Sequence, residues 1–132
     1  MGKIIIYYYS RNCYFSEEAK NIGTHLSKNS NMNIQVELYP IERNDSLKID
    51  ELKKIYKHDT FPIIIYRNIK NEDLLVGGNS DFLSIIDFVK DNKNINLQDY
   101  KKSIVQKNGK SNGKLRLTYY LLKKLSKKST FN

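Results

Sequence analysis

Apolar and polar residues alternate along the first half of this chain with periods that distinguish strands from helices. Residues 3–9 are predicted as a strand, because after Lys3 they form an unbroken apolar run, β-branched at its start and aromatic at its end, which is typical of a buried strand. From Phe15 to about Lys28, apolar residues recur every three or four positions and predict a helix. Strict alternation from Ile34 to Leu38, just before Pro40, then predicts a half-buried strand.

The same patterns continue through residue 93. Asp45 or Ser46 can cap a second helix. Residues 63–66 are a short apolar run, and residues 73–76 are an aspartate followed by three apolar residues; the polar turn between them predicts a hairpin. A last core helix is expected to start at Ser80 or Asp81, because the apolar residues that follow have helical spacing. These residues are Phe82, Ile85, Ile86 and Val89.

The predicted order is therefore strand, helix, strand, helix, strand, strand, helix. With right-handed crossovers, such a chain folds as an α/β domain around a central four-stranded mixed sheet, with helices on both faces. A chain of 132 residues is long enough for one such domain. No apolar stretch approaches the ~20 residues of a membrane span, and no long apolar signal region precedes small residues. We expect a cytoplasmic protein.

The net charge of +9 is unevenly distributed. Residues 1–96 carry 13 basic and 13 acidic residues, whereas residues 97–132 carry ten basic residues and the single acidic residue Asp99. This division predicts a neutral domain, residues 1–96, followed by a basic extension, residues 97–132.

The extension divides into a polar linker, about 107–114, and an amphipathic helix, about 115–128. That helix could lie on an anionic membrane, bind nucleic acid, dock on a partner or pack on its own domain. Its predicted apolar face consists of Leu115, Tyr119, Leu121, Leu122 and Leu125.

The single cysteine, Cys13, lies between the first strand and the first helix. A thiol at a helix N-terminus faces unpaired amides and the positive end of the helix dipole, which favour the reactive thiolate. The dipole lowers the thiol pKa by roughly one unit at most, so direct donors are needed. The alternative is an inert buried cysteine. The candidate donors are the amides of Tyr14, Phe15 and Ser16, the Ser16 hydroxyl and the Arg11 guanidinium.

Three separated motifs resemble the glutaredoxin branch of the thioredoxin fold, over about residues 1–93. They are Cys13-Tyr14-Phe15-Ser16, similar to the one-cysteine CxxS site; Thr60-Phe61-Pro62, similar to the T-[VF]-P motif; and the segment 77–83, similar to the GG-x-x-D motif. The resemblance implies Cys13 and Ser16 as catalytic residues and a cis peptide bond before Pro62. A simple proline at a strand start is the alternative for Pro62.

The resemblance also implies a glutathione site. The backbone of Phe61 would pair with the tripeptide, in the manner of an added strand. Glycine at 77 and 78 permits a sharp turn and a close approach to a ligand, and the helix beyond offers amides to a carboxylate. Asp81 would accept the ligand's ammonium, although Ser80 and Asp81 could equally serve as helix caps. The implied glutathione-binding residues are Arg11, Tyr14, Lys57, Thr60, Phe61, Pro62, Gly78, Asn79, Ser80 and Asp81.

The chain departs from the family at two places. Ser10 stands where glutaredoxins usually carry a lysine, so Arg11, Lys57 or His58 is expected to supply the cation. Tyr14 replaces the small glycine of cluster-carrying relatives, and their insertion before the motif is absent, which disfavours iron–sulfur binding. The histidines show no metal-ligand spacing with Cys13, so no protein-only metal site is expected.

The expected function is a monothiol, glutathione-dependent thiol–disulfide oxidoreductase that acts on glutathionylated proteins or small disulfides as a monomer. One alternative is a carrier in which two protomers and two glutathiones hold a [2Fe–2S] cluster through their Cys13 thiolates. Another is an interaction protein of the same fold with little catalytic activity.

Overall fold

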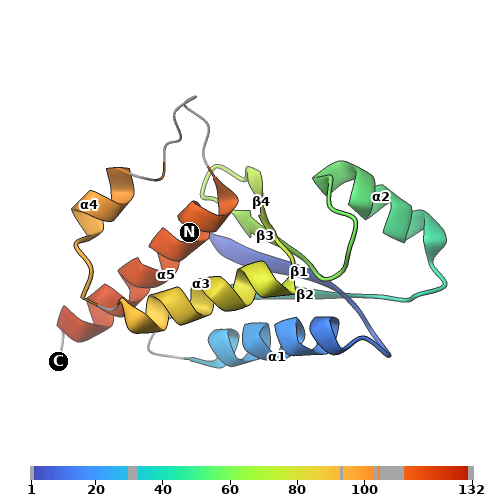
Figure 1. Ribbon diagram of the computed structural model, residues 1–132, viewed down its shortest axis with the longest axis horizontal. Coiled ribbons are helices and arrows are strands. Elements are labelled where there is room, and N and C mark those ends of the chain that lie inside the picture. The colour runs from blue at the N-terminus through green and yellow to red at the C-terminus, as the bar shows by residue number, and fades with distance from the viewer. Residues whose placement is uncertain (1, 30–32, 93, 103, 105–111, 131–132) are drawn as a thin grey trace.

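A computed structural model describes residues 2–29, 33–92, 94–102, 104 and 112–130. Four strands form one open sheet in the order β2-β1-β3-β4 (Figure 1). β1 is parallel to β2 and antiparallel to β3, and β4 is antiparallel to β3. The predicted α/β architecture with a mixed four-stranded sheet is therefore confirmed. The strands are β1 (Lys3–Tyr9), β2 (Gln35–Ile41), β3 (Ile63–Arg67) and β4 (Asp73–Gly77).

The described residues form five helices beside the sheet. Three were expected in the first 93 residues, and the predicted helix of the extension is also present. The short α4 was not predicted, because its six residues bury no side chain fully. Most of the predicted linker, namely residues 107–111, lies outside the described residues. The helices are α1 (Tyr14–Lys28), α2 (Ser46–Tyr56), α3 (Asn79–Asp91), α4 (Leu97–Lys102) and α5 (Gly113–Thr130).

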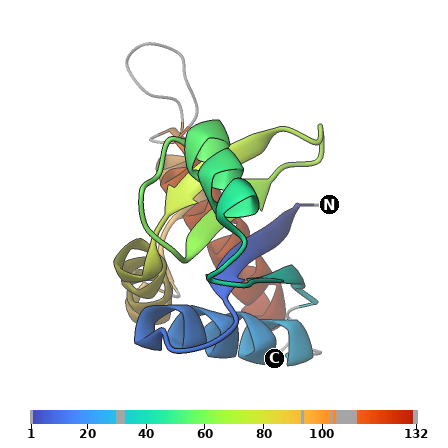
Figure 2. The same ribbon diagram turned by 90° about the vertical axis from the view of Figure 1, so that its right-hand side faces the viewer.

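The alternation of β1 divides the core between the two faces of the sheet. Ile4 and Ile6 belong to a large apolar cluster with residues of α1, α3 and α5. Ile5, between them, belongs to a smaller cluster that includes Ile49 and Leu52 of α2. Successive side chains of a strand point to opposite faces, so one continuous apolar run supplies both cores. Figure 2 shows α2 on one side of the sheet and α5 on the other, which confirms helices on both faces.

α5 is part of the main core, and this corrects the division of the chain at residue 96. Leu117, Leu121 and Leu122 are all but completely buried and belong to the larger cluster. Full burial of a leucine contributes about 1.5–3 kcal/mol. Of the predicted apolar face, Leu115, Tyr119 and Leu125 are only partly buried, because the helix is turned so that Leu117 and Tyr120 face the sheet. Packing on its own domain is the alternative that the structure supports.

Two boundaries differ from the sequence prediction. β2 continues through Pro40 to Ile41, with Pro40 opposite Tyr8. A proline is tolerated there because β2 is an edge strand, so no second neighbour needs its missing N–H. α3 begins one residue before the predicted cap, with Gly78 rather than Ser80 or Asp81 as N-cap. At α2 the prediction is confirmed: Asp45 Oδ1 accepts from the Lys48 amide at 3.3 Å.

No helix in the described parts of the chain is long and apolar enough to cross a membrane.

Candidate functional site

Three turns that carry the sequence motifs meet at one end of the sheet. β1 and β3 are antiparallel, with Tyr7 opposite Ile63. The end of β1, which leads to Cys13, therefore lies beside the start of β3. Gly77, at the end of β4, pairs with Ile64 at this same end. The N-terminal ends of α1 and α3 lie on this side (Figure 1). The fold thus brings together the three motifs that the sequence singled out.

Cys13 is the N-cap residue of α1. Its backbone is extended, with φ −143° and ψ 108°, and its carbonyl accepts from the Glu17 amide at 3.0 Å. Its thiol makes no capping hydrogen bond, and the residue is partly exposed. The sulfur therefore lies at the positive end of α1, as predicted, and solvent can reach it.

Ser16 links the thiol to the end of β1. The serine is completely buried, and its Oγ accepts from the Tyr9 amide at 2.9 Å. Because that oxygen is acting as an acceptor, its own proton is available for the sulfur. Burial raises the pKa of the Cys13 thiol, but hydrogen bonds from the Ser16 hydroxyl and amide and the Phe15 amide, together with the charge of Arg43, lower it below its ordinary value. Ser16 is thus a donor to the thiolate, as expected.

Arg43 is the cation beside Cys13, and the sequence reasoning missed it. Its Nη2 donates to the Asn12 carbonyl at 2.7 Å and its Nε donates to the Arg11 carbonyl at 3.2 Å. Its guanidinium also lies 4.4 Å from the centre of the Tyr9 ring. Arg43 therefore holds the loop before Cys13 and contributes positive charge to the thiol.

The sequence prediction named Arg11, Lys57 or His58 for this charge, whereas Arg43 is the residue whose charge lowers the thiol pKa; contact of the other three with a ligand stays a prediction. Arg11 is exposed and takes part through its carbonyl. Lys57 is exposed at the end of α2, with φ 52°. One pattern could have revealed Arg43: it follows β2, and parallel strands open their C-terminal loops at the same edge of a sheet.

The peptide bond between Phe61 and Pro62 is cis, as predicted. The Phe61 ring is buried and stacks on Tyr9 with 4.6 Å between ring centres. Thr60 is exposed, and its Oγ1 lies 3.3 Å from His58 Nε2. Since Arg43 covers the same tyrosine ring, aromatic stacking connects the proline turn to the loop that precedes Cys13.

The turn before α3 requires glycine at its first position. Gly77 has φ +135°, and a Cβ there would collide with the Asp81 carboxylate. The Gly78 amide donates to Asp81 Oδ2 at 3.0 Å. A Cβ on Gly78 would lie 3.3 Å from His58 Nε2, so this histidine adjoins the turn. The next amides, of Asn79 and Ser80, belong to the first turn of α3 and have no intrahelical acceptor.

Asp81, expected to receive the ligand's ammonium, already holds a cation of the chain. Lys114 Nζ, from the first turn of α5, donates to Asp81 Oδ1 at 3.0 Å. Burial raises the pKa of Asp81, but the hydrogen bonds from Lys114 and the Gly78 amide and the charge of His58 lower it below its usual range. Ser80 is exposed beside this pair.

A second carboxylate, Glu18 of α1, reaches the start of α3. Asn79 Nδ2 donates to Glu18 Oε1 at 2.6 Å, and the Tyr14 hydroxyl donates to Glu18 Oε2 at 3.2 Å. Asn79 is 6% exposed, and its Oδ1 has no hydrogen-bond partner among the described residues. Helical spacing makes Glu18 a neighbour of Tyr14, but its contact with Asn79 depends on the tertiary fold.

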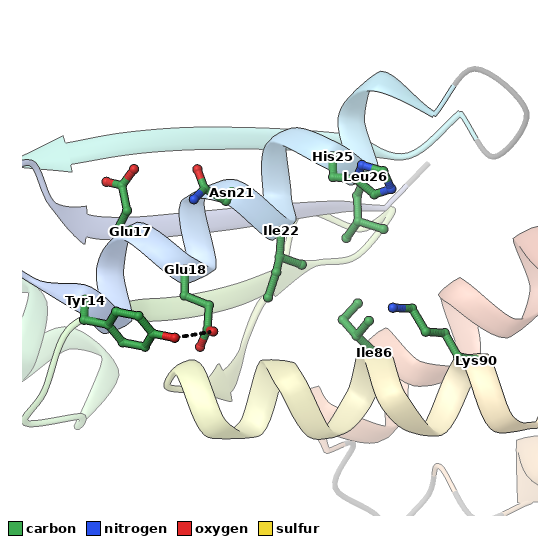
Figure 3. Close-up of a pocket in the computed structure, with 9 residues that line it drawn as sticks. All are labelled: Tyr14, Glu17, Glu18, Asn21, Ile22, His25, Leu26, Ile86 and Lys90. Atoms are coloured by element: carbon green, nitrogen blue, oxygen red, sulfur yellow. Dashed lines mark hydrogen bonds between the residues drawn. The ribbon is translucent and has the colours of Figure 1, made fainter.

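A groove of about 430 Å³ runs between α1 and α3 from the Tyr14 end of the site (Figure 3). Its floor is apolar, whereas carboxylates lie at the end near Tyr14 and Lys90 lies at the other end. The lining residues are Tyr14, Glu17, Glu18, Asn21, Ile22, His25, Leu26, Ile86 and Lys90.

In the described residues, no three His, Cys, Asp or Glu side chains are grouped so as to hold a metal ion. No protein-family model, curated protein or solved structure matches this chain. The function therefore has to be argued from the arrangement of Cys13, the cis-proline turn and the start of α3.

Proposed function

We propose that this protein is a glutathione-dependent thiol–disulfide oxidoreductase of the glutaredoxin type, with a thioredoxin-like fold and a monothiol mechanism. The single observation that carries the proposal is the position of Cys13. Its sulfur lies at the N-terminus of α1 with a depressed pKa, at the same sheet end as the cis peptide before Pro62. A thiolate is the nucleophile in disulfide exchange.

In the first step, the Cys13 thiolate attacks the glutathione sulfur of a mixed disulfide. A bond forms between Cys13 Sγ and that sulfur, the substrate's S–S bond breaks, and the substrate leaves as a thiolate that takes up a proton. In the second step, the thiolate of another glutathione attacks the glutathione sulfur held on Cys13. Glutathione disulfide leaves, and the Cys13 thiolate is regenerated.

The chain's own residues have distinct roles in this scheme. The Ser16 hydroxyl and the Phe15 amide stabilise the thiolate both before attack and after release. Ser16 has no thiol, so it cannot resolve the adduct, and a second glutathione is required. At the other end of the ligand, the Asn79 and Ser80 amides can bind a carboxylate. A ligand N–H would satisfy the buried Asn79 Oδ1.

The test is intact mass after incubation with glutathione disulfide. We expect one glutathione per chain, released by added glutathione. Because Cys13 is the only cysteine, Cys13→Ser should show no adduct and lose deglutathionylation activity while keeping its fold. A wild-type protein that forms no adduct at neutral pH, although iodoacetamide labels its thiol, would overturn the proposal.

The cluster-carrier function stays a prediction. It requires only one thiolate from each of two protomers, and anaerobic reconstitution with iron and sulfide, followed by absorption spectroscopy, tests it. The binding of an anionic membrane or nucleic acid also stays a prediction, but the apolar face that a membrane would need contains Leu121 and Leu122, which are buried.

A further inference from the structure

Lys114, in the first turn of α5, contacts Asp81 in the first turn of α3. Asn112 Oδ1 accepts from the Lys114 amide at 2.8 Å and from the Leu115 amide at 3.4 Å. The Lys114 carbonyl accepts from Thr118 Oγ1 at 2.7 Å, and Leu117, one turn on, is completely buried. The backbone of Lys114 is therefore fixed by a capped first turn whose next turn is anchored in the core.

Close packing of α5 on β4 sets the position of this turn. A Cβ at Gly113 would collide with the carbonyl oxygen of Leu75 in β4. From this position Lys114 reaches Asp81 with an Nζ–Oδ1 distance of 3.0 Å, and the other carboxylate oxygen accepts from the Gly78 amide. Both oxygens of Asp81 thus have a partner within the chain, and its charge is balanced by a lysine.

This arrangement changes what the α3 end of the site can recognise. An anion placed on the Asn79 and Ser80 amides gains the positive end of α3 and the nearby Lys114 ammonium. A ligand ammonium brought to Asp81 would lie beside the Lys114 ammonium, where like charges repel. A second acidic group that reaches this turn is Glu18, whose oxygens accept from Asn79 Nδ2 and the Tyr14 hydroxyl. His58 adds no negative charge.

We propose that Lys114, paired with Asp81, is a specificity-determining residue that makes this end of the site select thiols and disulfides bearing an anionic group without a neighbouring ammonium. The inference rests on the proposed function and names its substrate class. Glutathione carries an α-ammonium beside its γ-glutamyl carboxylate, so it lies outside the preferred class, although Cys13 still reacts with it under the proposed function. The analogue glutaryl-cysteinyl-glycine, which lacks only this amine, is the matched probe.

The experiment compares the rates at which Cys13 forms a mixed disulfide with glutathione disulfide and with glutaryl-cysteinyl-glycine disulfide. Wild-type protein should react with the amine-free disulfide at least as fast. Lys114→Met should shift the rate ratio toward glutathione disulfide by about twofold to fivefold, the range of a partly exposed ion pair. Lys114→Arg keeps the charge and should keep the wild-type ratio. Lys101→Met, at an exposed lysine of α4, is the control and should leave the ratio unchanged.

Three results would overturn the inference. The first is a rate ratio that Lys114→Met does not shift toward glutathione disulfide. The second is a wild-type preference for glutathione disulfide that Glu18→Gln abolishes, because Glu18 would then be the acceptor of the ammonium. In both, Cys13 still forms the adduct and the proposed function stands. In the third, neither disulfide reacts with wild-type protein, and the proposed function fails together with the inference.

Discussion

The two helices that point at the site begin in different ways. α1 starts at Cys13, whose side chain caps nothing, and the charge of Arg43 helps to lower the pKa of its thiol. α3 starts at a glycine turn, where the Gly78 amide donates to the Asp81 carboxylate. This carboxylate also forms an ion pair with Lys114. The N-terminus of α1 therefore faces the Cys13 thiolate, the reactive anion of the protein. At the N-terminus of α3, the Asp81 carboxylate is already neutralised by Lys114. The contrast separates a site for chemistry from a site for recognition.

The largest expected effect in this comparison is that of Ser16→Ala. The Tyr9 amide would lose its acceptor in a buried position, and the free energy of unfolding should fall by about 1–3 kcal/mol. The pKa of Cys13 should also rise, since a donor to the thiolate is removed. Urea denaturation and the pH dependence of iodoacetamide labelling measure the two effects. Ser80→Ala, at the exposed first turn of α3, should change stability by less than about 0.5 kcal/mol. If Ser16→Ala and Ser80→Ala lowered the free energy of unfolding equally, the proposed contrast between the N-termini of α1 and α3 would be wrong.

A smaller effect is expected for Asp81→Asn, which weakens the contacts of this side chain with the Gly78 amide and with Lys114. A weaker hydrogen bond from the Gly78 amide and loss of the ion pair with Lys114 should lower the free energy of unfolding by about 0.5–1.5 kcal/mol. The pKa of Asp81 is lower in the folded protein than in the unfolded one, so the unfolded state binds more protons between the two values. Its stabilisation is therefore complete above the ordinary pKa of about 4 and is lost as the pH falls through the folded value.

Urea denaturation across that pH range checks this prediction. The wild-type advantage over Asp81→Asn should shrink in acid. Asp87→Asn, at an exposed position of the same helix, provides the control and should show little change. A wild-type advantage that stays constant below pH 4 would contradict the role given to the Asp81 charge.

The smallest effect expected is that of Arg43→Gln on the reactivity of Cys13. This arginine is exposed and is the last of the groups that lower the thiol pKa. Below that pKa, the rate of iodoacetamide labelling should fall about twofold to fivefold, and the difference should diminish at high salt. Arg11→Gln removes a guanidinium two residues from Cys13 and should leave the rate unchanged. If Arg11→Gln slows labelling more than Arg43→Gln does, the assignment of the cation is wrong.

Local patterns in the sequence were enough for the strands and for the helices up to residue 93. β1 was predicted with its observed bounds, because both of its faces are buried and its apolar run is continuous. α5 was found, and Leu121 and Leu122 of its predicted apolar face are buried. The rest of the buried face was missed, since Leu115, Tyr119 and Leu125 have helical spacing as good as that of Leu117 and Tyr120. Which side of an apolar-rich helix faces the core depends on where α5 crosses the sheet, and this information is not local.

The candidate site shows the same limit. Cys13 and Ser16 are close in sequence, and the spacing of a helix start explains their contact. Arg43 and Lys114 come from loops and helices far along the chain, and their roles arise only when β2 and α5 have docked. Asp81 was recognised from its motif, but the cation that it holds comes from a segment expected to lie outside the domain.

Gly113 has a consequence for how this protein could change over time or by design. A methyl group at that position would push the first turn of α5 away from the Leu75 carbonyl, and the ammonium of the next residue would retreat from its carboxylate. The preference of the site among ligands could then be changed by an uncharged side chain at Gly113, a residue that contacts neither the ligand nor the Cys13 sulfur.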